Sequence, residues 1–326
     1  MREHVYLYDT IASNRRRIAL GVFVFFAVIF VEALVVAVIA VGGEAFEWRP
    51  FLMVFGAASG ATLLFLPLLA IWAYYRGKEA ILKLFRVETP SQGDAKKLRS
   101  ALAGVCMAAG AGEPETMVIS TSGVNAISLA RGYKDGLILV TRGAVENLSR
   151  DELEALLAHE VYHIVSRDTW MWMLGLGLSA FLPLVFFTYL GMVSKGLDRY
   201  RLLHTEYAVR LIFLITICFI AIWFILAAFW IPLWFVYFIV VLPRNRDYLA
   251  DAQAVLFTRN PDAVLSVVAK ADIMRSDPIK WGTVYVNHMF FNQPLEPPRT
   301  FTRWITDLFD THPAAEKRME RIRSMG

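Results

Sequence analysis

The residues best suited to chemistry form the pentapeptide His159-Glu160-Val161-Tyr162-His163, an H-E-x-x-H pattern. Residues four apart lie on one face of a helix, so His159 and His163 can present two imidazoles to a single Zn²⁺ ion. Glu160 lies beside them and can reach water at the same ion, as a general base must. The alternative is a pair of histidines that only solvate a helix face. The helix start upstream, with its regularly spaced apolar residues, favours the zinc site.

A catalytic zinc site requires a third protein ligand and leaves its fourth position for water. Asp247 and Asp251 are four residues apart in the run Arg246-Asp247-Tyr248-Leu249-Ala250-Asp251. On a helix, one carboxylate can bind the metal while the other, one turn along, accepts the proton of a ligand imidazole. His288 and His312 are the alternatives among the histidines. An aspartate near a helix start can also be favoured by the helix dipole alone.

The helix that carries the H-E-x-x-H pattern is expected to begin at Ser149. Ser149 and Glu152 form a Ser-x-x-Glu capping box ahead of Leu153, and apolar residues follow at helical spacing. No glycine or proline interrupts the sequence before the apolar stretch that follows Asp168. We therefore expect one continuous helix from Ser149 into that stretch.

A small sheet and further helices are expected around this helix. Residues 94–110 have helical periodicity, and short β-rich runs at residues 116–121, 124–129 and 136–141 are separated by turn residues. These runs predict a small sheet that contains a hairpin. The helices predicted near the C-terminus are residues 247–256, one that starts at Asn260, and residues 313–325.

The composition predicts a membrane protein. Of the 326 residues, 57% are hydrophobic and 19% are charged, whereas soluble domains average roughly 45–50% and about 25%. Four stretches are almost free of charge, and each exceeds the roughly 20 residues of a membrane-spanning helix. They lie between Arg17 and Glu44, where only Glu32 is charged, between Arg49 and Arg76, between Asp168 and Lys195, and between Arg210 and Arg244.

Basic residues on the short flanks orient these four predicted spans. Lys and Arg are enriched on the cytoplasmic side. Their positions before the first span and after the second place both chain termini in the cytoplasm. The loop at residues 195–210 is an exception, because it is basic and four spans would place it outside. The predicted organisation is an N-terminal arm with two spans (1–75), a cytoplasmic segment with the sheet and the H-E-x-x-H helix (76–168), two further spans (169–243), and a cytoplasmic segment with the third ligand (244–326).

Both candidate ligand sets lie close to the predicted membrane surface. His163 precedes the third span by about six residues, or roughly 9 Å of helix, and Asp247 follows the fourth by about four residues, or roughly 6 Å. The two sets therefore leave the bilayer on the same face at similar depth. This coincidence favours Asp247 as the third ligand.

Other classes of function fit the sequence less well. The net charge is +4 and no basic block occurs, so nucleic-acid binding is not expected. Cys106 and Cys218 lie in a polar and an apolar segment, so a disulfide between them is not expected. A transporter built around Glu32 would need polar residues in several spans, and Glu32 is the only charged residue in the four stretches.

Several motifs occur in an order that is similar to that of a known family. The H-E-x-x-H pentapeptide, the run ending at Asp251, Asn287-His288-Met289-Phe290-Phe291 and Thr311-His312-Pro313 follow one another along the chain. With the four spans, this arrangement resembles the HtpX family of membrane zinc metalloproteases over nearly the whole chain. The resemblance implies an α+β membrane protein with four transmembrane helices and a mostly helical, zincin-like cytoplasmic metalloprotease domain that contains a small β-sheet.

The resemblance also implies roles for single residues. The expected cofactor is Zn²⁺. The matching positions are His159 and His163 as metal ligands, Glu160 as general base, Asp251 as the support of a ligand histidine, His312 as a residue that helps to stabilise the oxyanion, and Asn125 as part of a substrate-binding strand. An extended peptide can pair with the edge of such a strand without much demand on its sequence.

One position departs from the family pattern. The family's third ligand is a glutamate, and this chain has Asp247 there. Aspartate also binds zinc, but its side chain is one methylene shorter, so the backbone must come roughly 1 Å closer to keep a Zn–O distance of about 2.0–2.2 Å. A catalytically weakened scaffold or adaptor with the same fold is therefore the alternative to an active enzyme.

The expected function is that of a zinc endopeptidase in protein quality control. The resemblance implies cleavage of misfolded or damaged membrane proteins, or of other unfolded polypeptides, at the cytoplasmic face of the inner membrane of a bacterial-type cell. The expected partners are these polypeptides and the lipid bilayer.

Overall fold

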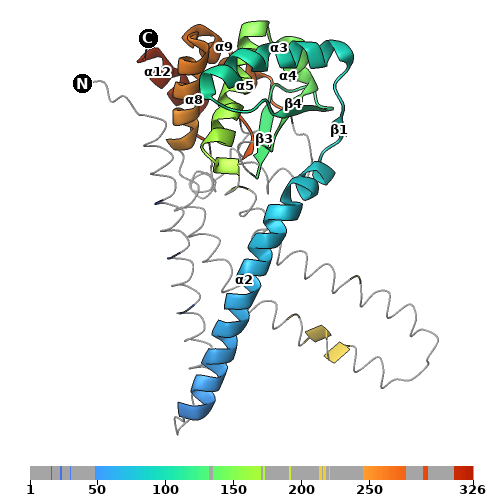
Figure 1. Cartoon of the computed structure of the whole chain (residues 1–326), viewed down its shortest axis with the longest axis vertical. Helices are drawn as coiled ribbons and strands as arrows, with labels where there is room; N and C mark the ends of the chain where they lie inside the picture. Colours follow the sequence, from blue (N-terminus) through green and yellow to red (C-terminus); the bar gives the residue numbers. More distant parts are fainter. Residues whose placement is uncertain are drawn as a thin grey trace, which may run out of the picture. The chain divides into compact units, whose positions relative to one another are not determined.

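Figure 1 shows the computed structural model of the chain. The structure describes residues 48–131, 135–169, 245–276, 289–292 and 312–325, together with the single residues Arg16, Phe23, Phe30, Trp172, Gly191, Phe213, Leu214, Thr216, Ile217 and Ile220. The chain divides into two compact units. One consists of Met1–Ile18, Trp72–Leu174 and Val240–Gly326, and the other of Ala19–Ile71 and Gly175–Ile239.

The described part of the chain is mostly helical with a small sheet. Its elements, in chain order, are α2 (Trp48–Leu84), β1 (Val87–Glu88), α3 (Gln92–Ala109), β2 (Glu115–Ile119), β3 (Ala126–Ala130), β4 (Gly136–Thr141), α4 (Arg142–Asn147), α5 (Arg150–Val165), α8 (Asn245–Thr258), α9 (Pro261–Ile273) and α12 (Ala315–Arg323).

The sheet is mixed, with strand order β1-β2-β4-β3. Strands β3 and β4 form the expected antiparallel hairpin, with Ala126 opposite Val140 and Ala130 opposite Gly136. Strand β2 pairs with β4 in parallel, and the two-residue β1, which the sequence did not predict, pairs with β2 in antiparallel. Strand β3 is therefore an edge strand, although all five of its residues are buried.

Local signals fix the starts of the helices that matter most for the site. Ser149 caps α5 and forms the predicted reciprocal capping box with Glu152. Asn260 caps α9, whose first turn contains Pro261. Each cap side chain accepts a hydrogen bond from one of the four N–H groups that every helix leaves unpaired at its start. The predicted starts of both helices are confirmed.

Helix α5 ends earlier than the sequence predicted. It stops at Val165, and Arg167 has a φ of 63°, in the left-handed region. The hydroxyl of Ser166 donates to the carbonyl oxygen of His163, a local bond that competes with the helical pattern. The expectation of one continuous helix is therefore wrong, because α5 ends before Asp168.

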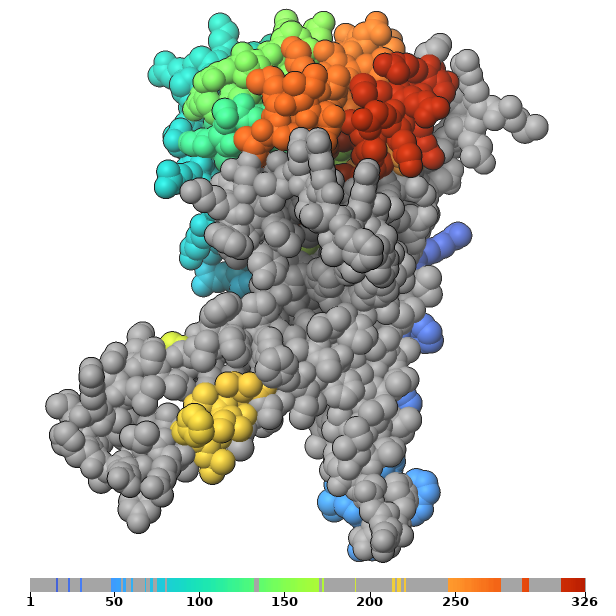
Figure 2. Space-filling view, turned by 180° about the vertical axis from the view of Figure 1, so that it is seen from behind, coloured from blue at the N-terminus to red at the C-terminus, as the bar shows by residue number. Residues whose placement is uncertain are grey.

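Helix α5 lies at the centre of the core of its unit. It packs against α3, α8, α9 and β3, and buried apolar residues such as Leu98 of α3, Leu157 of α5 and Val267 of α9 belong to one cluster. Burial of each such side chain contributes about 1.5–3 kcal/mol. Helix α12 packs against α9 and α8, and Figure 2 shows α12 (red) beside the orange helices at the surface.

The membrane spans stay predictions. The second predicted span falls on α2, and the first, third and fourth lie outside the described residues apart from single positions. In the part of the chain that the structure describes, no helix combines the length and apolar character needed to cross a membrane.

Candidate active site

Helix α5 directs both histidines of the H-E-x-x-H pattern to one point. Because the capping box fixes the start of the helix, the spacing of four puts His159 and His163 on one face. Their Nε2 atoms lie 3.1 Å apart, and both side chains are almost completely buried. The two rings converge as two ligands of one metal ion do.

Helix α8 adds the third candidate ligand. Asp247 lies in its first turn, where the helix dipole favours a carboxylate. One ligand atom of Asp247 and one of each histidine, His159 and His163, all lie within 4.8 Å of one another. The packing of α8 along α5 thus brings together the three residues that the sequence predicted as metal ligands.

Asp251, one turn after Asp247 on α8, orients His159. Nδ1 of His159 lies 2.9 Å from Oδ1 of Asp251. An imidazole that donates from Nδ1 to a carboxylate keeps its Nε2 lone pair for a metal. Burial lowers the pKa of His159 to about 4, against the opposing effect of Asp251, so the ring is neutral near pH 7. This placement agrees with the supporting role that the resemblance implied for Asp251.

Arg318 of α12 holds Asp251 from its other side. Its Nε donates to Oδ2 at 2.8 Å and its Nη2 donates to Oδ1 at 2.6 Å. Its Nη1 donates to the carbonyl oxygen of Phe291 at 2.7 Å, and the guanidinium lies over the Phe291 ring. Burial alone would raise the pKa of Asp251, but the Arg318 charge holds that pKa well below its usual value. Asp251 is therefore an ionised acceptor for His159.

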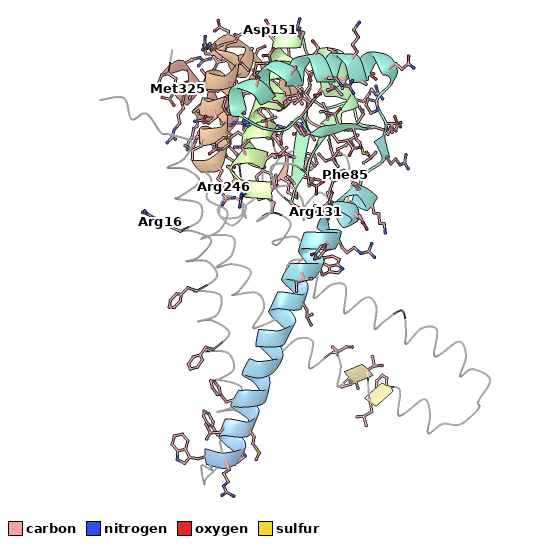
Figure 3. All side chains as sticks on the ribbon, in the orientation of Figure 1. Arg16, Phe85, Arg131, Asp151, Arg246 and Met325 are labelled. Atoms are coloured by element: carbon pink, nitrogen blue, oxygen red, sulfur yellow. The ribbon has the colours of Figure 1, made fainter. Side chains whose placement is uncertain are left out.

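Asp168 supports His163 in a similar way. The turn after α5 places Oδ2 of Asp168 3.0 Å from Nδ1 of His163. Nη1 of Arg246 lies 3.3 Å from Oδ1 of the same carboxylate. Although burial opposes ionisation, Arg246 keeps the pKa of Asp168 below its ordinary value. Figure 3 shows Arg246 near the C-terminal end of α5, far from Asp151 in the first turn of that helix.

Glu160 is a buried carboxylate beside the two histidines, with only 1% of its surface exposed. Burial raises the pKa of Glu160 to about 7, while His163 and the hydroxyl of Ser128 act in the opposite direction. A carboxylate whose pKa lies near the operating pH can accept a proton and return it. These properties suit the general base of a hydrolytic site.

His312 lies next to Asp247. Its Nδ1 is 2.8 Å from Oδ2 of Asp247. Burial alone would raise the pKa of Asp247, but His312 and, to a smaller extent, Arg318 lower it below its ordinary value. The contact places His312 at the site as a partner of the third candidate ligand. Its role toward an oxyanion stays a prediction.

Asn125 precedes β3 and binds the segment of residues 289–292. Its Nδ2 donates to the carbonyl oxygen of Asn292 at 2.7 Å, and its Oδ1 accepts from the N–H of Asn292 at 3.1 Å. An antiparallel bridge also joins this segment to β3. The contact of Asn125 with substrate stays a prediction. His288, the alternative metal ligand, lies outside the described residues.

The donor set fits a zinc ion. Imidazoles that donate from Nδ1 to Asp251 and Asp168 and bind metal through Nε2 direct two lone pairs to one point, and lone pairs 3.1 Å apart repel each other unless a cation lies between them. Two nitrogens that bind one tetrahedral zinc at about 2.0–2.1 Å lie roughly 3.3 Å apart. Two imidazoles and one carboxylate, with a fourth position for water, are the ligands of many catalytic zinc sites.

The part of the chain that contains this site matches a known family. Residues 92–326, well over half of the chain, match the family described as Peptidase family M48. The chain belongs to peptidase family M48. As an M48 peptidase it is a metallopeptidase, an enzyme that hydrolyses peptide bonds.

Curated relatives are similar to this M48 peptidase over most of its length. The "Protease HtpX homolog" of Dictyoglomus thermophilum is 28% identical over 319 residues, which cover 98% of this chain and 95% of the relative. The protein of the same description from Lactobacillus helveticus is 28% identical over 330 residues, with coverage of 98% and 100%. That from Pyrococcus furiosus is 29% identical over 256 residues, with coverage of 78% and 82%. No solved structure matches the chain.

Two residues that support the candidate metal ligands of this M48 peptidase were not predicted from the sequence. The burial of Arg318 could have been predicted from its position. Arg318 stands at helical spacing from Ala315 and Ile322, which are buried, and so lies on the buried face of α12. A charged residue on such a face requires a buried partner. Asp168 carries no comparable signal, because its contact with His163 depends on the turn at Arg167.

Proposed function

We propose that this M48 peptidase is a membrane-anchored zinc endopeptidase that cleaves misfolded or damaged membrane proteins on the cytoplasmic side. The observation that carries the proposal is the buried convergence of His159, His163 and Asp247 beside Glu160. The four long uncharged stretches of the sequence support the membrane anchor. Similarity to proteins described as HtpX protease homologs supports the proteolytic activity.

The residues that would hold the zinc ion are His159 and His163 through Nε2 and Asp247 through its carboxylate. When bound there, zinc supplies Lewis acidity, which polarises a scissile carbonyl and makes water acidic enough to lose a proton near pH 7. Asp251 and Asp168 keep the two imidazoles in the tautomer that presents Nε2.

The side chains around the ligands supply the proton transfers. Glu160 takes the proton from the attacking water and delivers it to the leaving amine, a double role that suits a carboxylate with a pKa of about 7. His312 lies at hydrogen-bond distance from Asp247, and in this proposal it stabilises the charge that develops on the carbonyl oxygen. Strand β3 lies at one edge of the sheet, and an extended substrate would lie along the part of that edge that residues 289–292 do not occupy.

Zinc content and cleavage, measured on the same preparations, test this function. The full chain in detergent is expected to contain one zinc per molecule and to cleave a membrane protein that has been unfolded beforehand. The variant Glu160→Gln is expected to keep its zinc and lose cleavage, because only the proton acceptor is removed. A wild-type chain with no zinc and no cleavage would show that the proposal is wrong.

A weakened scaffold or adaptor is the competing function, because Asp247 is shorter than the expected glutamate and is also engaged by His312. Zinc bound in full, with cleavage absent from both the wild type and Asp247→Glu, would favour the scaffold. Cleavage by the wild type that is lost in Glu160→Gln favours the enzyme.

A further inference from the structure

Ser128 of β3 and Glu160 of α5 are two deeply buried polar side chains. Ser128 is 0% exposed and Glu160 is 1% exposed. Within the described part of the chain, Oγ of Ser128 and Oε2 of Glu160 make no hydrogen bond. A buried polar group without a hydrogen bond costs stability. Two such groups in one unit therefore indicate a functional role.

The alternation of side chains along β3 directs the Ser128 hydroxyl toward α5. Ala126 and Ala130 both belong to the core cluster that contains the apolar residues of α5. Successive side chains of a strand point to opposite faces, so Ser128 shares the face of Ala126 and Ala130. A polar side chain thus interrupts the apolar face of β3 that covers the H-E-x-x-H helix.

The C-terminal end of α5 lies against the end of β3. Ala130 pairs with Gly136, and a Cβ atom placed on Gly136 would lie 3.1 Å from Cδ1 of Ile164. The hydroxyl of Thr169, which follows α5, donates to the carbonyl oxygen of Ala130 at 3.0 Å. Figure 3 agrees, because Arg131, just after β3, and Asp151, in the first turn of α5, lie at opposite ends of the unit.

Glu160 and Ser128 lie at similar distances before the contact between the ends of α5 and β3, so the two residues lie at the same level of the interface. Glu160 lies one helical turn before Ile164, about 6 Å along the helix axis. Ser128 lies two residues before Ala130, about 7 Å along the strand. The two side chains therefore face each other across the interface of β3 and α5. The Ser128 hydroxyl is close enough to the Glu160 carboxylate to interact with it.

We propose that Ser128 is a positioning residue for the general base, with its hydroxyl donating a hydrogen bond to Oε2 of Glu160 during peptide hydrolysis. This bond leaves Oε1 of Glu160 turned toward the reacting groups. A general base acts only within hydrogen-bond reach of the proton that it takes, and small misplacements lower the rate strongly. The inference rests on the peptidase activity of the chain and assigns a role to a residue of β3 outside the metal ligands.

The test compares Ser128→Ala with Ser128→Thr in the zinc-loaded full chain in detergent, using dye-quenched casein as an unfolded substrate. Ser128→Ala is expected to lower kcat roughly tenfold and to change KM less than twofold, because the hydroxyl contacts neither substrate nor metal. Ser128→Thr keeps the hydroxyl and suits a strand, so at least half of the wild-type kcat is expected. Ser128→Cys, which keeps the volume with a poorer donor, replaces the alanine variant under the same criteria if that variant folds poorly.

Ser120→Ala serves as the matched control, because Ser120 is an exposed serine at the end of β2 whose hydroxyl bonds Glu88. It is expected to match the wild type. Zinc content and the temperature of unfolding are expected to be unchanged in Ser128→Ala, which separates positioning from a structural role. A wild-type kcat in Ser128→Ala, equal losses in the Ala and Thr variants, or loss of zinc in Ser128→Ala would overturn this inference alone. A wild-type chain that binds zinc and cleaves nothing would overturn both this inference and the proposed enzyme.

Discussion

Arg318 and Asp251 form a two-pronged ion pair that is shielded from solvent, with N–O distances of 2.8 and 2.6 Å and side-chain exposures of 0% and 2%. The pair joins the last helix, α12, to α8, and through Asp251 it reaches His159 of α5. A segment far from the H-E-x-x-H pattern in sequence thus sets the orientation of one imidazole of the candidate metal site.

Removal of the Arg318 side chain is expected to destabilise the metal-free protein strongly. The variant Arg318→Ala leaves the Asp251 carboxylate buried without its cation, which typically costs about 3–5 kcal/mol. The free energy of unfolding, measured in denaturant on the metal-free full chain, checks this value. Arg321→Ala is the matched control: Arg321 is exposed on the same helix and lies over the ring of Tyr248. Its expected loss is below about 1 kcal/mol. Equal losses in both variants would contradict a special role for the buried pair.

Asp247 is the candidate for the third protein ligand of zinc. Asp247→Ala is expected to lose zinc, because two imidazoles alone make an incomplete site. Asp247→Glu is expected to retain or improve zinc binding, because the longer side chain relaxes the approach required of the backbone. Metal analysis of the purified variants gives the answer. Normal zinc content in Asp247→Ala would instead indicate that Asp251 or His288 supplies the third ligand.

Asp168 is expected to tune zinc affinity without touching the metal. Loss of the carboxylate that orients a ligand histidine usually lowers affinity about 10–100-fold, so Asp168→Ala should show a loss of this size in competition with a chelator. Arg167→Gly is the matched control, because Arg167 is exposed and its φ of 63° suits glycine. An unchanged affinity in Asp168→Ala would show that the contact with His163 does not fix the ring.

Local signals in the sequence were enough to predict most elements around the site. The capping box of Ser149 and Glu152 acts within one helical turn, and the β-rich runs alternate with clear turn residues, so neither depends on distant parts of the chain. The ligand pattern is equally local, because residues four apart on a helix share a face whatever surrounds them. These features therefore appear in the structure where the sequence placed them.

Long-range and conformational features could not be predicted in this way. The end of α5 depends on the left-handed conformation of Arg167. Arginine adopts this conformation rarely, and no neighbouring residue type predicts it. The contact of Asp168 with His163 follows from that turn. The pairing of Arg318 with Asp251 joins residues 67 positions apart, and only the packing of α12 against α8 brings them together.

Glu152 links the start of α5 to α9 and should make stability depend on pH. Its Oε1 accepts from the hydroxyl of Ser266 at 2.5 Å, and its Oε2 accepts from Nζ of Lys270 at 2.8 Å. Burial alone would raise the pKa of Glu152, but these bonds and the capping bond to Ser149 lower it from 4.5 to about 2. Between these values the unfolded chain binds more protons than the folded chain. The stabilisation is therefore complete above about pH 4.5 and is lost as the pH falls toward 2.

Replacement of Glu152 by glutamine removes this dependence. Glu152→Gln is expected to be less stable than the wild type by about 2 kcal/mol at pH 7, since hydrogen bonds to charged groups contribute about 1.5–3 kcal/mol. The difference should shrink as the pH falls from 4.5 toward 2, because the wild-type carboxyl then takes up a proton and loses its charge as well. Unfolding temperatures of the metal-free chain across this range provide the measurement. Asp151→Asn, at an exposed position in the same turn, controls for the general effect of removing one acidic group. A difference between Glu152→Gln and the wild type that stays constant from pH 7 to pH 2 would show that stabilisation by Glu152 does not depend on its charge.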